Sequence, residues 1–121
     1  MKKNNQASVT DLTYLKKVSN GDNDFIQEMI SVYLRETPEA INNLECHLKN
    51  KDWKKFKAVT HKMKPSFSFF GLKDLYLTVD SMEEYSDKEI NLEQLPAMIE
   101  KVKTVCTKAM RELKDKKNLF D

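Results

Sequence analysis

The sequence predicts an all-α protein: an up-and-down four-helix bundle with a short additional N-terminal helix. Apolar residues recur at helical spacing along most of the 121-residue chain, and no segment alternates cleanly enough for a strand. Glycine and proline are scarce, at 2 and 3 residues, which favours long helices with few connections. The length suits one domain over residues 1–121, with loose tails expected over about 1–7 and 115–121.

The first two helices follow from capping residues and breaks. A short helix is predicted from a cap at Thr10 or Asp11 to about Ser19. The second helix begins near Asp24, and Pro38 is expected to interrupt it. Because proline is tolerated in the first turn of a helix, a new or kinked helical segment should continue beyond it.

The remaining helices are marked by one strong cap and one glycine. Asp52 is a good N-cap for a third helix over residues 53–69, which Gly71 should end or bend. A fourth helix is predicted over residues 72–85. After a polar link, a fifth should span residues 92–113, and the rest of the chain is expected to fray.

Composition and charge narrow the functional classes. With 21 Lys and Arg against 19 Asp and Glu, the net charge of +2 gives no general reason to expect nucleic-acid binding. Cys46 and Cys106 are far apart and form no CxxC pair, which indicates a reduced cytosolic protein. No apolar run approaches the 18 residues of a membrane span, and no signal-peptide h-region follows the first lysines. We therefore expect a cytoplasmic protein with no membrane contact.

His61 lies on an unusual face of the third predicted helix. At about 100° per residue it falls roughly 160° from the centre of the apolar stripe, which places its imidazole in solvent. Neither His61 nor His47 has a His or Cys at i+3 or i+4, so no metal site is predicted. The apolar stripe comprises Phe56, Val59, Met63, Phe67 and Phe70, and the outward side also carries Lys54, Lys57, Lys64 and Ser68.

The segment over residues 61–71 resembles the active-site helix of histidine-containing phosphotransfer (HPt) domains. That family shows a histidine, a lysine three residues on, small residues four and seven on, and a glycine about ten on. The matching residues here are His61, Lys64, Ser68 and Gly71.

The resemblance covers roughly residues 10–113. It includes Leu12-Thr13-Tyr14-Leu15, the segment from Gly21 to Phe25, Thr37-Pro38 and Asp52-Trp53. Pro65 departs from the pattern, because it stands where the family usually has glycine. A proline inside a helix removes one N–H and crowds the carbonyl four residues earlier, so we expect a kink just after His61.

The resemblance implies that His61 accepts and donates a phosphoryl group. The partners it implies are receiver domains of response regulators or hybrid sensor histidine kinases, with Mg²⁺ held by the receiver and no cofactor in this chain. Lys64, and also Lys57, can neutralise phosphoryl oxygens or meet an acidic partner. Ser68 and Gly71 are expected to leave room for docking. With no glycine-rich ATP loop, the chain should be a phosphocarrier and not an autonomous kinase.

Two alternatives stay open. The chain could be a non-catalytic helical interaction module in which His61 is incidental. It could also bind nucleic acid through the lysines of residues 54–64, although the balanced charge and the lack of interleaved exposed aromatic residues argue against this. Phe69 lies off the apolar stripe and should pack on a neighbouring helix or contribute to a docking surface.

A bundle formed by one chain suggests a monomer.

Overall fold

The computed structural model describes residues 8–120, which are helical almost throughout and contain no strand. The prediction of an all-α fold is confirmed. The predicted tail over residues 1–7 lies outside the described part of the chain. The helices are α1 (Thr13–Val18), α2 (Asn23–Lys49), α3 (Trp53–Phe69), α4 (Lys73–Lys88) and α5 (Leu95–Lys117), with 3₁₀ turns η2 (Leu92–Gln94) and η3 (Asn118–Phe120).

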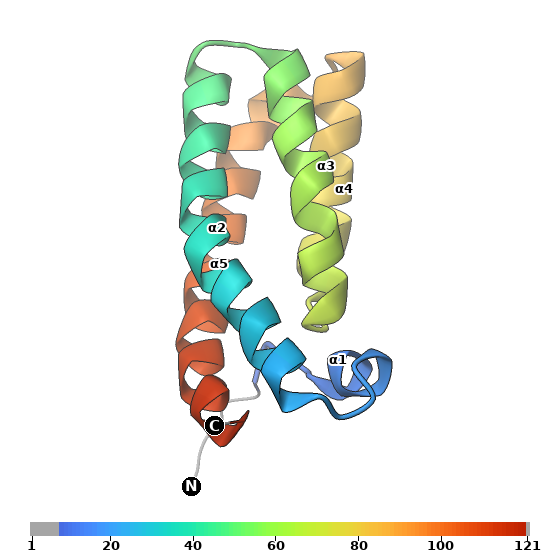
Figure 1. The fold of residues 1–121 in the computed structure, drawn as a ribbon. Helices are drawn as coiled ribbons and strands as arrows, with labels where there is room; N and C mark the ends of the chain where they lie inside the picture. The colour runs from blue at the N-terminus through green and yellow to red at the C-terminus, as the bar shows by residue number, and fades with distance from the viewer. Residues whose placement is uncertain (1–7, 121) are drawn as a thin grey trace, which may run out of the picture.

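The four long helices run up and down beside one another (Figure 1). Helix α3 packs against α2 and α4, and α5 packs against the same two helices from the other side. The short α1 lies across the end of the bundle at which α3 finishes (Figure 1). This arrangement places the middle of α3 on the side of the bundle, where one face of the helix is open to solvent.

The core is formed by the apolar stripe that each helix turns inward. On α3 the predicted stripe is buried except for Val59, which is only partly covered, and Thr60 is fully buried instead. The Thr60 hydroxyl donates to the Lys57 carbonyl at 2.7 Å, so its burial leaves no unpaired donor. The fully buried large side chains are Tyr33, Phe56, Phe67, Phe70, Leu15, Ile26, Ile30, Leu44, Leu75, Met82, Leu95 and Leu113.

Of the two expectations beyond Pro38, a new helix is wrong, whereas a bent helix that continues agrees with the structure. Helix α2 is continuous from Asn23 to Lys49, although Figure 1 shows that it changes direction along its length. Pro38 is exposed, whereas Thr37 and Ile41 on the inner face are buried. The lost N–H bond therefore falls on the solvent side, where water can replace it, and core packing carries the helix through.

Residues 114–120 are helical and not frayed as expected. Helix α5 continues to Lys117, and the chain then forms η3. Two contacts account for this: Phe120 packs against the core, and Glu112 and Lys116 bind the segment before α1. Helix α4 also runs three residues past its predicted end, to Lys88, where Glu89 adopts a left-handed conformation with φ 53°.

The end of α3 is built around Gly71. Its φ of +69° is the left-handed conformation that glycine adopts without strain. The N–H of Leu72 donates to the Phe67 carbonyl at 2.8 Å and that of Gly71 to the Ser68 carbonyl at 3.3 Å, which is a Schellman motif. The prediction that Gly71 ends this helix agrees with the structure.

Candidate functional site

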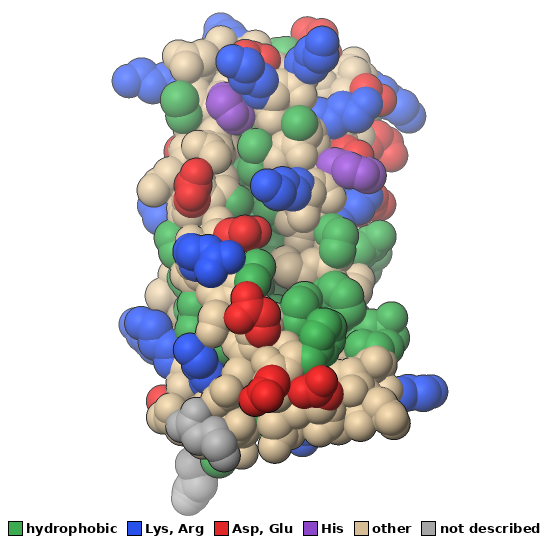
Figure 2. All heavy atoms as spheres, in the orientation of Figure 1, with side chains coloured by type: hydrophobic (Ala, Val, Ile, Leu, Met, Phe, Trp, Pro, Cys, Tyr) green, Lys and Arg blue, Asp and Glu red, His purple; other side chains and the backbone are tan. Residues whose placement is uncertain are grey.

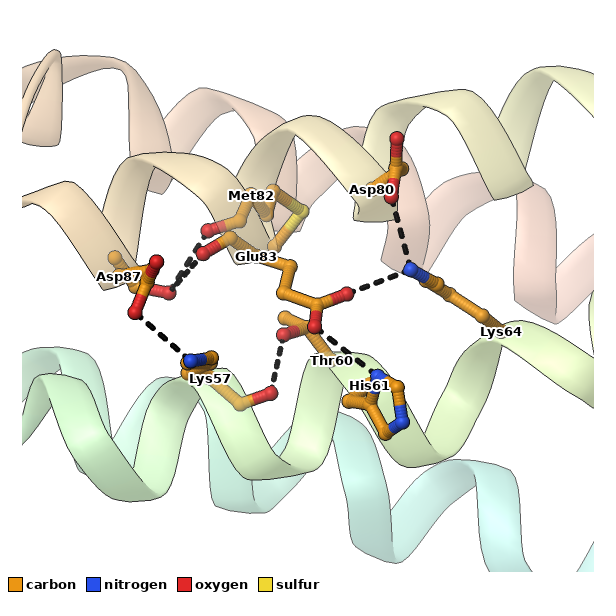
Figure 3. A network of polar contacts seen from close by, with 9 residues as sticks. Lys57, Thr60, His61, Lys64, Asp80, Met82, Glu83 and Asp87 are labelled. Carbon is orange, nitrogen blue, oxygen red and sulfur yellow. Dashed lines mark hydrogen bonds and ion pairs between the residues drawn. The ribbon is translucent and has the colours of Figure 1, made fainter.

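His61 lies near the middle of α3, and its side chain is 73% exposed. Its ring does not extend freely into solvent, because Nδ1 lies 3.0 Å from Oε2 of Glu83 on α4 (Figure 3). The other ring nitrogen points away from the polar network in the same view. The imidazole is thus anchored through one nitrogen and accessible through the other.

Glu83 is the carboxylate that joins His61 to Lys64. Its Oε1 accepts a hydrogen bond from the Lys64 ammonium at 2.7 Å, while Oε2 faces His61. Burial alone would raise the pKa of Glu83, but the hydrogen bonds and charges of Lys64 and His61 outweigh burial and lower it. Glu83 is therefore ionised at neutral pH.

Lys64 is more enclosed than its position on an outward helix face suggests. Its side chain is only 15% exposed, and its ammonium also donates to Asp80 at 2.8 Å. The hydrogen bonds to Asp80 and Glu83 raise the pKa of Lys64. The ring of Tyr76 lies beneath the ammonium, with its centroid 5.6 Å from Nζ.

A third contact repeats the pattern one turn earlier, where the Lys57 ammonium donates to Asp87 at 2.8 Å. The hydrogen bond and the charges of this pair lower the pKa of Asp87 and raise that of Lys57. Each step along α3 is matched by an equal step back along the antiparallel α4. We call this set the charge ladder: Lys57–Asp87, His61–Glu83 and Lys64 with Asp80 and Glu83.

The family of the chain follows from comparison with known families. The family model described as Hpt domain matches residues 28–115, a range that contains all of α3, α4 and the charge ladder. The chain belongs to the Hpt domain family. Such domains act in phosphotransfer in two-component signalling and interact with receiver domains of response regulators. Comparison with curated proteins and with solved structures gave no match.

The carboxylates of the ladder were missed in the sequence of this Hpt domain. Asp80, Glu83 and Asp87 follow one another at helical spacing on α4, with the opposite charge pattern to the basic positions of α3. That complementarity was the available signal. The complementary charges indicate that these faces of α3 and α4 meet. They do not show which residues lie opposite one another, because the position of α4 along α3 depends on the length of the turn between the two helices.

The lysines that share the outward side of α3 with His61 do not form a purely basic face. Lys57 and Lys64 are both paired with carboxylates, and only Lys64 is largely covered. Figure 2 shows basic and acidic side chains side by side on the face that carries the histidines. This mixture also weakens the nucleic-acid alternative, which depended on a continuous basic surface.

The space beside Gly71 that a side chain would fill is occupied by the N-terminal segment. A Cβ at this position would lie 2.8 Å from the Cβ of Asp11, in the segment that precedes α1. The N–H of Asp11 donates to the Phe70 carbonyl at 2.9 Å and holds the two segments together. Gly71 is required here for this close approach, whereas Ser68 is exposed on the outer face of α3.

The structure also places Phe69 and Pro65, two further residues of α3. Phe69 packs on α1, where its ring centroid lies 6.1 Å from that of Tyr14. Pro65 is exposed and lies inside α3, which remains one unbroken helix. Since proline has no N–H, the carbonyl of His61 lacks the donor that an i+4 residue normally supplies.

Within residues 8–120, no group of three or more His, Cys, Asp or Glu side chains is arranged to hold a metal ion. None of the helices described combines the length and apolar character needed to cross a bilayer.

Proposed function

We propose that this Hpt domain shuttles a phosphoryl group between receiver-domain aspartates, of a hybrid sensor kinase and a response regulator, through Nε2 of His61. The observation that carries the proposal is the anchored imidazole. An ionised Glu83 can only accept a hydrogen bond, so the proton of a neutral His61 resides on Nδ1. Nε2 then presents its lone pair to solvent and to an incoming phosphoryl group.

The chemistry needs no proton removal by this chain. The Nε2 lone pair attacks phosphorus while the bond from phosphorus to the receiver aspartate oxygen breaks, and that carboxylate leaves with the bonding electrons. The imidazole becomes a positively charged ring that still carries its Nδ1 proton. Glu83 lies where it can stabilise this charge. In the reverse step an aspartate oxygen attacks phosphorus and the P–N electrons return to Nε2.

The other predicted residues have supporting roles in this proposal. Lys64, and at a greater remove Lys57, are the cations that can neutralise the phosphoryl oxygens once they move away from the carboxylates that pair with them. The exposed Ser68 leaves space for the partner on the outer face of α3. Mg²⁺ held by the receiver neutralises the phosphoryl oxygens during transfer, so this chain needs no cofactor of its own. We expect it to act as a cytoplasmic monomer and as a phosphocarrier, without kinase activity toward ATP.

A small P–N donor tests the acceptor without knowledge of the natural partner. We expect potassium phosphoramidate to phosphorylate the purified protein once, at His61, to give an acid-labile and alkali-stable phosphoryl group by ³¹P NMR. His61→Gln should abolish the signal. The matched control is His47→Gln, because His47 is the second histidine of the chain and lies on α2.

Transfer is tested by adding receiver domains with Mg²⁺ to the phosphorylated protein. Loss of label from His61 and its appearance on a receiver aspartate is the expected result. If His61→Gln and wild type were labelled equally, or if no receiver of the source proteome discharged the label, the phosphocarrier proposal would be wrong. The protein would then fit the interaction-module alternative, in which His61 is incidental.

A further inference from the structure

The ladder presents Lys64 in a position that the proposed phosphocarrier role does not explain. Figure 3 shows its ammonium between Asp80 and Glu83, on the α4 side, while the second ring nitrogen of His61 points away from both carboxylates. The contacts are short, at 2.8 Å and 2.7 Å, and leave the side chain 15% exposed. The cation is thus held away from the atom that would carry the phosphoryl group.

The balance of charges at the site also makes the position of Lys64 important for a phosphoryl group. One ammonium meets two carboxylates, so the group of Lys64, Asp80 and Glu83 carries one net negative charge. A phosphoryl group adds a charge of about −2. The positive imidazole ring offsets part of this negative charge, and movement of Lys64 toward the phosphoryl oxygens would offset more of it.

Asp80 and Glu83 differ in what they contact. Glu83 touches both Lys64 and His61 and is 17% exposed, so it is tied to the imidazole itself. Asp80 touches Lys64 in the ladder and is 56% exposed. Asp80 therefore acts on the site through Lys64 and can be changed without removing a contact of His61.

We propose that Asp80 is a positioning residue that restrains Lys64 and thereby shortens the lifetime of phosphorylated His61. This inference rests on the proposed function, since it presupposes a phosphoryl group on Nε2. A cation on the phosphoryl oxygens stabilises the bound group more than the loosely bonded transition state in which it departs. By competing for that cation, Asp80 keeps the phosphoryl group easy to release.

The experiment compares lifetimes of the phosphohistidine in the absence of any partner. Wild type and Asp80→Asn are charged with phosphoramidate, freed of donor by desalting, and followed by ³¹P NMR at neutral pH. We expect the half-life to lengthen about three- to fivefold in Asp80→Asn, the scale set by a partly exposed ion pair. Glu84→Gln is the matched control, because Glu84 loses the same charge on α4 but pairs with Lys88 of its own helix.

A second pair of variants shows whether Asp80 acts through Lys64. Lys64→Ala and the double variant Asp80→Asn/Lys64→Ala should have the same short half-life, since the released cation is then absent. Thermal unfolding of each variant reports its fold, and only folded variants are compared.

The outcomes separate this inference from the proposed function. If wild type takes no phosphoryl group on His61, the proposed function fails. If wild type is phosphorylated and Asp80→Asn decays at the wild-type rate, the role of Asp80 is refuted while the carrier role stands. A longer half-life that persists without Lys64, or that Glu84→Gln reproduces, would also refute it.

Discussion

Glu83 gives the reactive histidine of this Hpt domain a fixed tautomer and a fixed direction. An isolated surface imidazole rotates and exchanges its proton between two nitrogens. Here the ionised carboxylate 3.0 Å from Nδ1 selects the form in which Nε2 carries the lone pair. Lys64 contributes indirectly, because its ammonium helps to keep Glu83 ionised.

Replacing Glu83 by glutamine tests this at the scale of one residue. A glutamine amide can either accept from Nδ1–H or donate to Nδ1, so it no longer selects the reactive tautomer, and it cannot offset charge on the ring. Since hydrogen bonds to charged groups exceed neutral ones by roughly 1 kcal/mol, we expect phosphorylation by phosphoramidate to slow by about fivefold. The rate constant is measured by ³¹P NMR.

The control for Glu83→Gln is Asp87→Asn, which makes the same chemical change at the ladder contact that does not involve His61. It should leave the phosphorylation rate within about twofold of wild type. Equal rates in Glu83→Gln and wild type would show that the imidazole reacts without help from α4.

The residues of this site differ in how far the sequence could predict them. His61 stands out from its own helix alone, since its face and its neighbours are set by a period of 3.6 residues. The enclosure of Lys64 depends on Asp80 and Glu83, which belong to another helix. One helix pattern gives the angular position of a side chain but not the side chain that faces it, so the carboxylate partners of Lys57 and Lys64 were not predicted.

At the scale of elements, the turn from α3 to α4 is fixed by contact with a distant segment. Gly71 has a positive φ and also lies against Asp11, which precedes α1. The bond from the Asp11 N–H to the Phe70 carbonyl ties that segment to the end of the helix that carries His61. The end of α3 is therefore held by both its own turn and the N-terminal segment.

Two glycine-to-alanine substitutions separate the two demands on Gly71. Gly21 also has a positive φ, of +79°, but a Cβ there would meet nothing within 4 Å. We expect Gly21→Ala to lower the free energy of unfolding by about 1 kcal/mol, the cost of the left-handed conformation. Gly71→Ala should cost about 2–4 kcal/mol, because the added Cβ also collides with Asp11.

Urea denaturation of both variants measures this difference. Losses of equal size would mean that the segment around Asp11 moves readily and that the backbone conformation alone requires glycine at residue 71.

The observed helix boundaries also depend on contacts between distant segments. Capping predicted the start of α3 well, whereas the ends of α4 and α5 are set by packing that no local pattern records.

At the scale of the whole molecule, Glu112 joins the start of the described chain to its last helix. Its carboxylate accepts from the Val9 and Thr10 N–H groups at 2.9 and 3.0 Å and from the Thr10 hydroxyl at 2.7 Å. Burial alone would raise the pKa of Glu112, but the hydrogen bonds from Ser8, Val9 and Thr10 lower it to about 2. No periodic pattern marks this irregular segment, so its contact with Glu112 could not be predicted from the sequence.

Because of this contact, part of the free energy of unfolding depends on pH. Since the folded pKa of Glu112 is below its ordinary value of 4.5, its stabilisation is complete above about pH 4.5 and is lost as the pH falls toward 2. We expect Glu112→Gln to lower the free energy of unfolding at pH 7 by about 1–2 kcal/mol, a figure already reduced for solvent screening. That loss should lower Tm by roughly 4–8 °C.

Thermal unfolding of wild type and Glu112→Gln between pH 7 and pH 2.5 checks the sign. The difference in Tm should shrink as the pH falls, because the wild-type carboxylate becomes protonated. Glu100→Gln on the exposed face of the same helix is the control and should show no such trend. A Tm difference that stays constant with pH would mean that the charge of Glu112 does not hold the N-terminal segment.

The anchoring of His61 to α4 has a consequence for genetics. Because the imidazole is also a cross-link between two helices, an allele that encodes alanine at residue 61 removes a structural contact together with the chemistry. A glutamine allele keeps a side-chain N–H that can reach Glu83 and removes only the nucleophile. Phenotypes in living cells can be assigned to lost signalling from the glutamine allele, whereas the alanine allele also reports any fall in protein abundance.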